Sequence, residues 1–219
     1  MHLSRFDVDP RRRTAARWAA SPHAMHAAVM RACNPEPGER VLWRLDRHTS
    51  FAELFVVSPR EPHPEEILRE ATDGQPGAFA TADYEPFLAN IADGQCWRFR
   101  LTANPTYASS GSGSGSTRGK VRPHVSATHQ VEWFRSQSER HGLSFVDESG
   151  LDTAAIVHRE VRSFGGSRGD GEPPRRITLS VATIQGVLTV TDGAALRSAL
   201  VSGIGRAKGY GCGLLTLAR

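Results

Sequence analysis

Apolar and polar residues alternate along several short stretches of the chain, and this pattern predicts half-buried β-strands. In the clearest stretch Val41, Trp43 and Leu45 alternate with polar residues, and an apolar run at 51–57 follows after a short polar turn. Two such runs joined by a short turn predict a hairpin. We expect further strands at 3–8, 96–101, 154–164, 177–181, 187–190 and 214–217, with a two-residue turn at Gln185 and Gly186.

Apolar residues recur at helical spacing elsewhere. Ser21 followed by Pro22 is typical of a helix start, because the hydroxyl caps the first turn and proline fits the first helical position. Met25 and Ala28 belong to the stripe that this helix buries. We expect other helices at 65–71, from Ser126 to about 140, and from Asp192 to 201, a weak helical turn at 84–91, and an exposed basic loop at 11–17.

The order of these elements predicts an α+β fold of two tandem ferredoxin-like domains. Residues 1–102 follow the order β-α-β-β-(α)-β of such a domain. Residues 103–119 form a linker that we expect to be flexible, because its centre consists of serine and glycine alone. Residues 120–219 follow as a degenerate copy, with a long charged hairpin and a terminal glycine-rich loop.

Composition narrows the classes of function. The chain has 219 residues, enough for two small domains, and a formal net charge of +4 that permits an anionic partner. Its three cysteines are isolated, so neither a zinc site nor a disulfide framework is expected. A long apolar run and a signal peptide are absent, and we expect a cytoplasmic protein without a membrane partner.

The glycine-rich loop at 203–213 is the first candidate site. Glycine lets a backbone approach a ligand closely, and outward N–H groups can cradle phosphates. A tight connection before the last strand, with no ligand at all, explains the glycines equally well. The loop residues that we expect to contact a phosphate are Gly203, Gly205, Arg206, Lys208, Gly209 and Gly211.

Two histidines supply the second candidate site. His23 and His26 lie three residues apart on the first helix, so their rings can share one patch of surface. Histidine gives or takes a proton near neutral pH, and beside a phosphate cradle this favours phosphodiester cleavage without a metal or other cofactor. The sequence has no carboxylate cluster suited to Mg²⁺. Ordinary solvated histidines and a solvated hairpin tip are the alternative interpretation.

Three motifs of the sequence resemble those of a known family. The pattern Ser21-Pro22-His23-Ala24-Met25-His26 resembles the catalytic helix of CasE, the CRISPR RNA endonuclease of type I-E Cascade. The run WRFRLTANP at 97–105 resembles that family's "FRLxANP" strand end, and the tail at 203–215 is similar to its glycine-rich loop. The resemblance covers the whole chain in the same order.

The resemblance implies tandem ferredoxin-like domains and metal-free cleavage of a CRISPR repeat RNA hairpin. In that reaction the 2′-OH attacks the phosphate and leaves a 2′,3′-cyclic phosphate and a 5′-OH. His26 matches the catalytic histidine, His23 falls where members often carry a tyrosine, and Arg31 matches a basic position that stabilises the phosphorane. Other Cascade subunits are implied partners. The cations expected to bind the RNA outside the glycine loop are Arg118, Lys120, Arg162, Arg168, Arg175 and Arg176.

Two other classes of function compete. Ferredoxin-like domains often bind RNA through aromatic residues on the sheet, so a non-catalytic subunit that binds an RNA hairpin is the main alternative. Here the alternation assigns Trp97 and Phe99 to the core, which favours binding through loops. A small-molecule enzyme on this scaffold has no pocket signature in the sequence.

Overall fold

The first half of the chain forms a four-stranded antiparallel sheet covered on one face by helices. The structure, a computed structural model, describes residues 1–72, 78–109, 120–165 and 176–219. The sheet order is β2-β3-β1-β4, the order of a ferredoxin-like βαββαβ unit. Its elements are β1 (His2–Val8), α1 (Arg13–Ala20), α2 (Pro22–Cys33), β2 (Leu42–Arg47), β3 (Ala52–Ser58), α3 (Glu65–Ala71) and β4 (Phe79–Asp83).

Two elements of this half differ from the sequence-based prediction. The predicted basic loop after β1 contains helix α1, because Ala15 and Trp18 lie three residues apart and both pack into the core. The segment before 84, interpreted as loop, contains β4, which pairs with β1 and brings Phe79 to 4.7 Å from the ring of Phe6. The first correction arises from the burial of two residues in a polar segment, and the second from backbone pairing with β1.

The second half repeats the same unit. The strand order is β11-β5-β10, and β9 pairs with the other edge of β10, next to the short β8. The repeat consists of β5 (Cys96–Ala103), α5 (Ala127–Arg140), β9 (Ala154–Gly165), β10 (Arg176–Val190), α6 (Gly193–Ser202) and β11 (Leu215–Ala218). The remaining elements are α4 (Glu85–Ala89), β6 (Thr106–Ser109), β7 (Lys120–Pro123), β8 (Leu143–Ser144) and the 3₁₀ turn η1 (Lys208–Tyr210).

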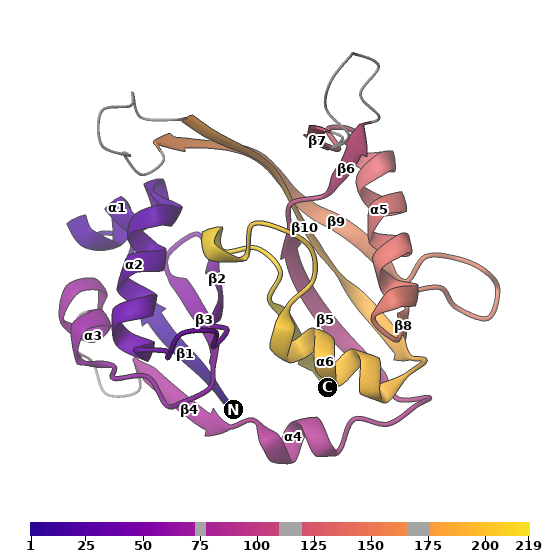
Figure 1. Cartoon of the computed structure of the whole chain (residues 1–219), viewed down its shortest axis with the longest axis horizontal. Coiled ribbons are helices and arrows are strands. Elements are labelled where there is room, and N and C mark those ends of the chain that lie inside the picture. The colour runs from indigo at the N-terminus through magenta and orange to yellow at the C-terminus, as the bar shows by residue number, and fades with distance from the viewer. Residues whose placement is uncertain (73–77, 110–119, 166–175) are drawn as a thin grey trace.

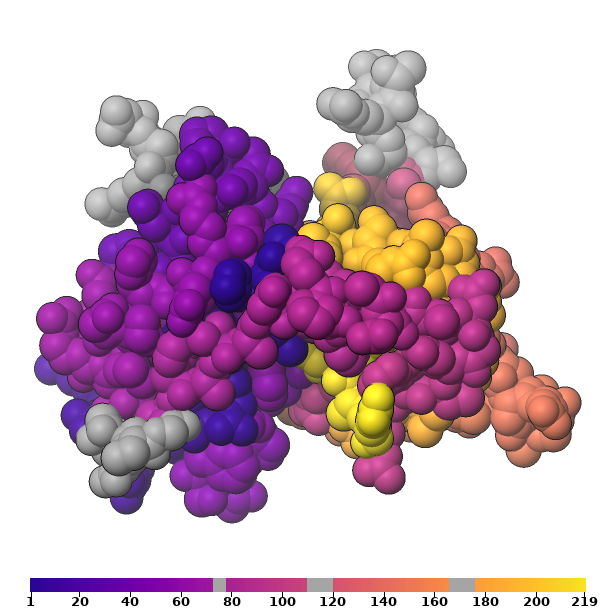
Figure 2. Space-filling model, turned by 90° about the horizontal axis from the view of Figure 1, so that it is seen from below, coloured from indigo at the N-terminus to yellow at the C-terminus, as the bar shows by residue number. Residues whose placement is uncertain are grey.

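The strand β5 belongs to the second sheet, not to the first as its place in the sequence suggested. It pairs with β10 and β11, while β4 occupies the edge of the first sheet beside β1. We therefore propose domains at 1–83 and 96–219 in place of 1–102 and 120–219. Figure 2 shows the connecting segment, in magenta, crossing between the halves near the yellow C-terminal end. The expected linker at 103–119 thus starts inside the second domain, and its residues 110–119 lie outside the described residues.

The predicted turn at Gln185 and Gly186 is wrong, because β10 runs unbroken through both residues. Gly186 instead permits a close approach by β9. A Cβ at this position would lie 2.2 Å from the carbonyl oxygen of Thr153 and 2.5 Å from the Cα of Ala154. The glycine therefore marks close strand packing rather than chain reversal.

A buried guanidinium joins the two sheets. Arg44 on β2 has a side chain that is 2% exposed, and it donates to both carboxylate oxygens of Asp46 at 2.8–3.1 Å. Across the domain boundary it donates to the backbone oxygens of Arg100 and Leu214, each at 3.0 Å, and to the hydroxyl of Thr216 at 2.9 Å. These bonds fix β2 against β5 and β11, next to the segment that carries the glycine loop.

Candidate active site

Helix α2 positions the two histidines. Ser21 caps it as predicted, its hydroxyl accepting from the backbone N–H of Ala24 at 3.3 Å. Met25 and Val29 bury the helix face that rests on the first sheet. His23 is exposed, while His26 is half-buried at the edge of that face.

The ring of His26 lies between β2 and the glycine loop. The indole N–H of Trp43 donates to His26 Nδ1 at 3.3 Å. On the other side of the ring, a Cβ at Gly209 would lie 3.5 Å from Nε2, so η1 faces this nitrogen across a gap about the size of a methyl group. Burial lowers the pKa of His26, and the neighbouring His23 lowers it further. Both effects favour the neutral form of its imidazole.

The glycine loop reaches this position because it packs closely on both domains. Gly211 has a φ of +78°, and a Cβ there would lie 2.6 Å from the ring of Trp43. Gly203 and Gly205 stand in the same way against Leu42 and Trp133. In Figure 1 the yellow η1 lies beside α2 and β2, and both elements contact it. The loop is a tight connection, as one interpretation held, and it also borders His26.

The two cations of the loop differ in their surroundings. Arg206 is exposed and forms a backbone bridge with Asn104. Lys208 donates from Nζ to the backbone oxygen of Ser202 at 2.7 Å. Burial and then the charge of Arg40 lower the pKa of Lys208. Arg206 is therefore the more accessible of the two.

The structure does not bring Arg31 to the histidines. Its Nε donates to Glu66 of α3 at 3.0 Å. In Figure 1, α3 and η1 lie on opposite sides of α2. Five residues separate Arg31 from His26, a step of about 140° around an α-helix, so the two side chains leave the helix in different directions. Arg31 is thus engaged with Glu66 in this structure, and its part in the site stays a prediction.

The cations expected to bind the RNA outside the glycine loop also differ in their contacts and exposure. Arg162 on β9 pairs with Glu160 at 2.6 Å, and its Nη1 reaches the backbone oxygen of Tyr210 at 3.5 Å. It therefore joins the hairpin to the glycine loop. Arg176 is exposed at the start of β10, where its Nε donates to the hydroxyl of Ser163 at 2.5 Å. Lys120 is exposed on β7, and Arg118, Arg168 and Arg175 lie outside the described residues.

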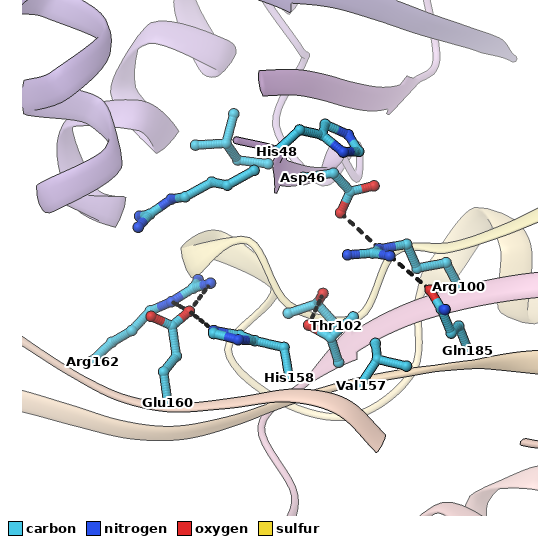
Figure 3. Close-up of a pocket in the computed structure, with 12 residues that line it drawn as sticks. Asp46, His48, Arg100, Thr102, Val157, His158, Glu160, Arg162 and Gln185 are labelled. Carbon is cyan, nitrogen blue, oxygen red and sulfur yellow. Dashed lines mark hydrogen bonds and ion pairs between the residues drawn. The ribbon is translucent and has the colours of Figure 1, made fainter. Parts of the chain in front are cut away.

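A cavity of about 480 Å³ lies between β2 and the strands β5, β9 and β10 (Figure 3). Most of its charged side chains already have partners. Arg100 donates to Asp46 and to Gln185, and Arg162 pairs with Glu160. Arg47, which also lines the cavity, donates to the backbone oxygen of Ala19. An anion entering here must displace these contacts. The cavity is therefore a weaker candidate for a phosphate than the surface beside His26.

Sequence reasoning missed one residue of the site. The alternation of β2 assigned Trp43 to the core, and the residue is indeed 2% exposed. No local pattern in the sequence predicts the hydrogen bond of Trp43 to His26, because the two residues belong to different elements. Among the described residues, no group of three metal-ligating side chains converges. Across the same parts of the chain, no helix has the length and apolarity that a membrane crossing requires.

The sequence and the architecture of this chain are both similar to those of known proteins. The curated CRISPR-associated endoribonuclease Cse3 of Thermus thermophilus is 25% identical over 221 residues, with full coverage of both chains. A solved structure of the CRISPR endoribonuclease Cse3 bound to 19 nt RNA is also 25% identical, with a TM-score of 0.81 over the full length of both chains. It shares the tandem ferredoxin-like fold.

A chain of a CRISPR RNA-guided surveillance complex in a pre-nicking state has the same fold. It is 24% identical, with a TM-score of 0.63 over 100% of this chain and 99% of that one. A family model described as CRISPR associated protein matches residues 1–219. These matches confirm the resemblance to CasE drawn from the sequence, and the chain belongs to the CRISPR associated protein family.

Proposed function

We propose that this protein is an endoribonuclease that cleaves CRISPR repeat RNA at the base of a hairpin and remains with the product as a Cascade subunit. The observation that carries the proposal is the half-buried imidazole of His26 between Trp43 and the glycine loop at Gly209. The similarity to an endoribonuclease, and to a chain bound to RNA, supports RNA as the substrate.

The proposed reaction needs no group beyond the RNA and the protein. The 2′-oxygen forms a bond to phosphorus, the bond from phosphorus to the 5′-oxygen breaks, and the products carry a 2′,3′-cyclic phosphate and a 5′-OH. One proton leaves the 2′-OH, another reaches the 5′-oxygen, and negative charge grows on the phosphate between them. We assign His23 and His26 to these tasks, because an imidazole can exchange a proton near neutral pH or donate a hydrogen bond to developing negative charge.

Metal independence is the first expected result. Cleavage of a repeat hairpin should continue in EDTA at the rate seen without it, because two imidazoles can supply proton transfer and a hydrogen bond to the phosphate without a metal. The 3′ end of the upstream fragment should resist phosphatase until acid opens the cyclic phosphate. The measurement is a sequencing gel of the end-labelled RNA. A requirement for Mg²⁺ together with a 3′-OH end contradicts this mechanism.

We propose that the stem is held by cations of the hairpin and its surroundings. Arg176 and Lys120 are the exposed cations of this set that the structure describes. We assign Arg118, Arg168 and Arg175 to the same task by resemblance. Arg206 and Lys208 are proposed to contact the phosphates nearest the cleaved bond. Double-stranded RNA is recognised largely through its shape and its phosphates, which suits guanidinium and ammonium groups.

The double variant Arg176→Ala/Lys120→Ala should bind the hairpin more weakly, and the slope of log K against log salt should fall by about one for each phosphate that the protein no longer neutralises. The measurement is filter binding at several salt concentrations. The matched control is Arg69→Ala, which removes an exposed cation of α3. Equal affinity and equal slope in the double variant and the control place the stem elsewhere on the molecule.

A further inference from the structure

The indole of Trp43 constrains where His26 can carry its proton. An indole nitrogen is a donor only, so the bond from Trp43 Nε1 to His26 Nδ1 at 3.3 Å requires Nδ1 to accept. A neutral imidazole has one acceptor nitrogen and one N–H group. With Nδ1 accepting, the proton of neutral His26 lies on Nε2, the nitrogen beside Gly209.

The surroundings of Trp43 hold this arrangement in place. The side chain is 2% exposed and belongs to the core beneath α2. Its six-membered ring lies against Gly211, where a Cβ would come within 2.6 Å. An indole that is confined on both sides has little freedom to turn. A buried N–H without an acceptor is also costly, which favours the bond to His26.

We propose that Trp43 is the positioning residue of the active site, fixing His26 as a neutral imidazole whose Nε2–H donates a hydrogen bond to the scissile phosphate. This inference rests on the proposed function. If Nδ1 of His26 were protonated, its N–H would point at the indole N–H of Trp43, and two donors would face each other. The indole therefore disfavours the imidazolium form of His26. A donor aimed at the phosphate stabilises the negative charge that develops there during cleavage.

Other groups around His26 are consistent with this assignment. His23 is the ionisable neighbour on its own helix, and its charge disfavours protonation of His26 in the same direction as burial. On η1, Lys208 and Tyr210 flank the glycine that faces Nε2. The ionisable pair where α2 meets α3 is Arg31 with Glu66, which neutralise each other. Arg17 lies in the last turn of α1, which also packs on α2.

The direct test is the ¹⁵N spectrum of the histidine rings in the full-length protein at neutral pH. In the wild type, His26 should show a protonated Nε2 and an unprotonated Nδ1. In Trp43→Phe the ring should shift to a mixture of tautomers, because phenylalanine offers no N–H. The matched control is Trp18→Phe, which trims another tryptophan of the same core. It should leave the His26 signals at their wild-type positions.

Cleavage supplies the second readout. Trp43→Phe should slow single-turnover cleavage by about 10- to 100-fold, as is typical when the partner that orients a metal-binding histidine is removed. Affinity for the hairpin should stay within about twofold, because many phosphate contacts elsewhere carry the binding. Trp18→Phe should cleave near the wild-type rate.

Two results overturn the proposal. One is a wild-type spectrum with the proton of His26 on Nδ1. The other is a Trp43→Phe variant that matches Trp18→Phe in both tautomer and rate. If Trp43→Phe does not fold, the variant His26→Gln tests the donor role instead, because the amide N–H of glutamine can replace the donor at Nε2. His26→Gln should cleave faster than His26→Ala. Equal cleavage rates of these two variants refute the donor role. Wild-type protein that fails to cleave at all refutes the proposed function, while the spectrum still tests the tautomer.

Discussion

His26→Ala should slow single-turnover cleavage of the repeat hairpin by a factor on the order of 10²–10⁴, the contribution of a positioned acid, base or charge-stabilising donor. The imidazole of His26 fills the space between the indole of Trp43 and the backbone of Gly209, and the alanine side chain brings no polar atom to that space. The hydrogen bond that we propose from Nε2 to the phosphate is therefore removed. The measurement is a rate under excess enzyme.

Binding distinguishes a catalytic effect from loss of the fold. The affinity of His26→Ala for the hairpin should stay close to wild type in a gel shift on the same preparation, because one imidazole adds little to many phosphate contacts. His63→Ala is the matched control, since His63 is an exposed histidine of the same domain. Cleavage by His26→Ala at the control's rate refutes the catalytic assignment. Binding without cleavage by the wild type as well supports the non-catalytic RNA-binding subunit instead.

His23→Ala should cause a smaller loss than His26→Ala. His23 is exposed, and it falls where the family often carries a tyrosine, so a tight fit of its ring is not required. A loss equal to that of His26→Ala makes His23 a full partner in proton transfer. The same single-turnover assay, run beside His63→Ala, decides between these outcomes.

Arg44→Ala should lower the free energy of unfolding by about 3–5 kcal/mol, the usual cost of removing one partner of a buried ion pair. Asp46 has a side chain that is 6% exposed, and it keeps the ion pair with Arg100 but loses its buried partner once Arg44 is gone. The carbonyl oxygens of Arg100 and Leu214 lose a charged donor at the same time. Each of these buried acceptors then makes fewer hydrogen bonds than in the wild type, which lowers the stability of the folded state.

Urea unfolding followed by circular dichroism measures the effect of Arg44→Ala. Arg69→Ala is the control, because it removes an exposed arginine from α3 and should change stability by less than about 0.5 kcal/mol. Because Arg44 joins β2 to the second sheet, its loss should also reduce cleavage. A variant as stable as the control shows that the bonds of Arg44 add little to the stability of the contact between the two domains.

Local signals in the sequence were sufficient for most helices and for the first hairpin. Ser21, Ser126 and Asp192 each accept the backbone hydrogen bond expected of a helix cap. The pairing of β2 with β3 follows from two alternating runs and a short turn. Such features depend on residues within a few positions of one another, so their physical causes lie in the sequence itself. The candidate histidines on α2 were found in the same way.

Long-range pairing was decided only by the tertiary structure. The strand β5 alternates like any half-buried strand, and its sequence does not say which sheet has an open edge for it. β4 occupies the edge beside β1, so β5 becomes a central strand of the second sheet. Likewise Arg31 has the residue type and approximate spacing for the site, yet it extends toward Glu66 on α3.

The hydrogen bond between Trp43 and His26 was likewise decided only by the tertiary structure. Each residue fits a local pattern, a buried strand position for Trp43 and a half-buried helix position near the cap for His26. Their contact depends on how α2 crosses the sheet and on how closely the loop at Gly209 and Gly211 approaches from the other end of the chain. The sequence thus indicated His26 as the candidate catalytic residue, whereas the protonation that we propose for it depends on neighbours that only the folded chain assembles, because hydrogen bonds act over a few ångströms in space and not along the sequence.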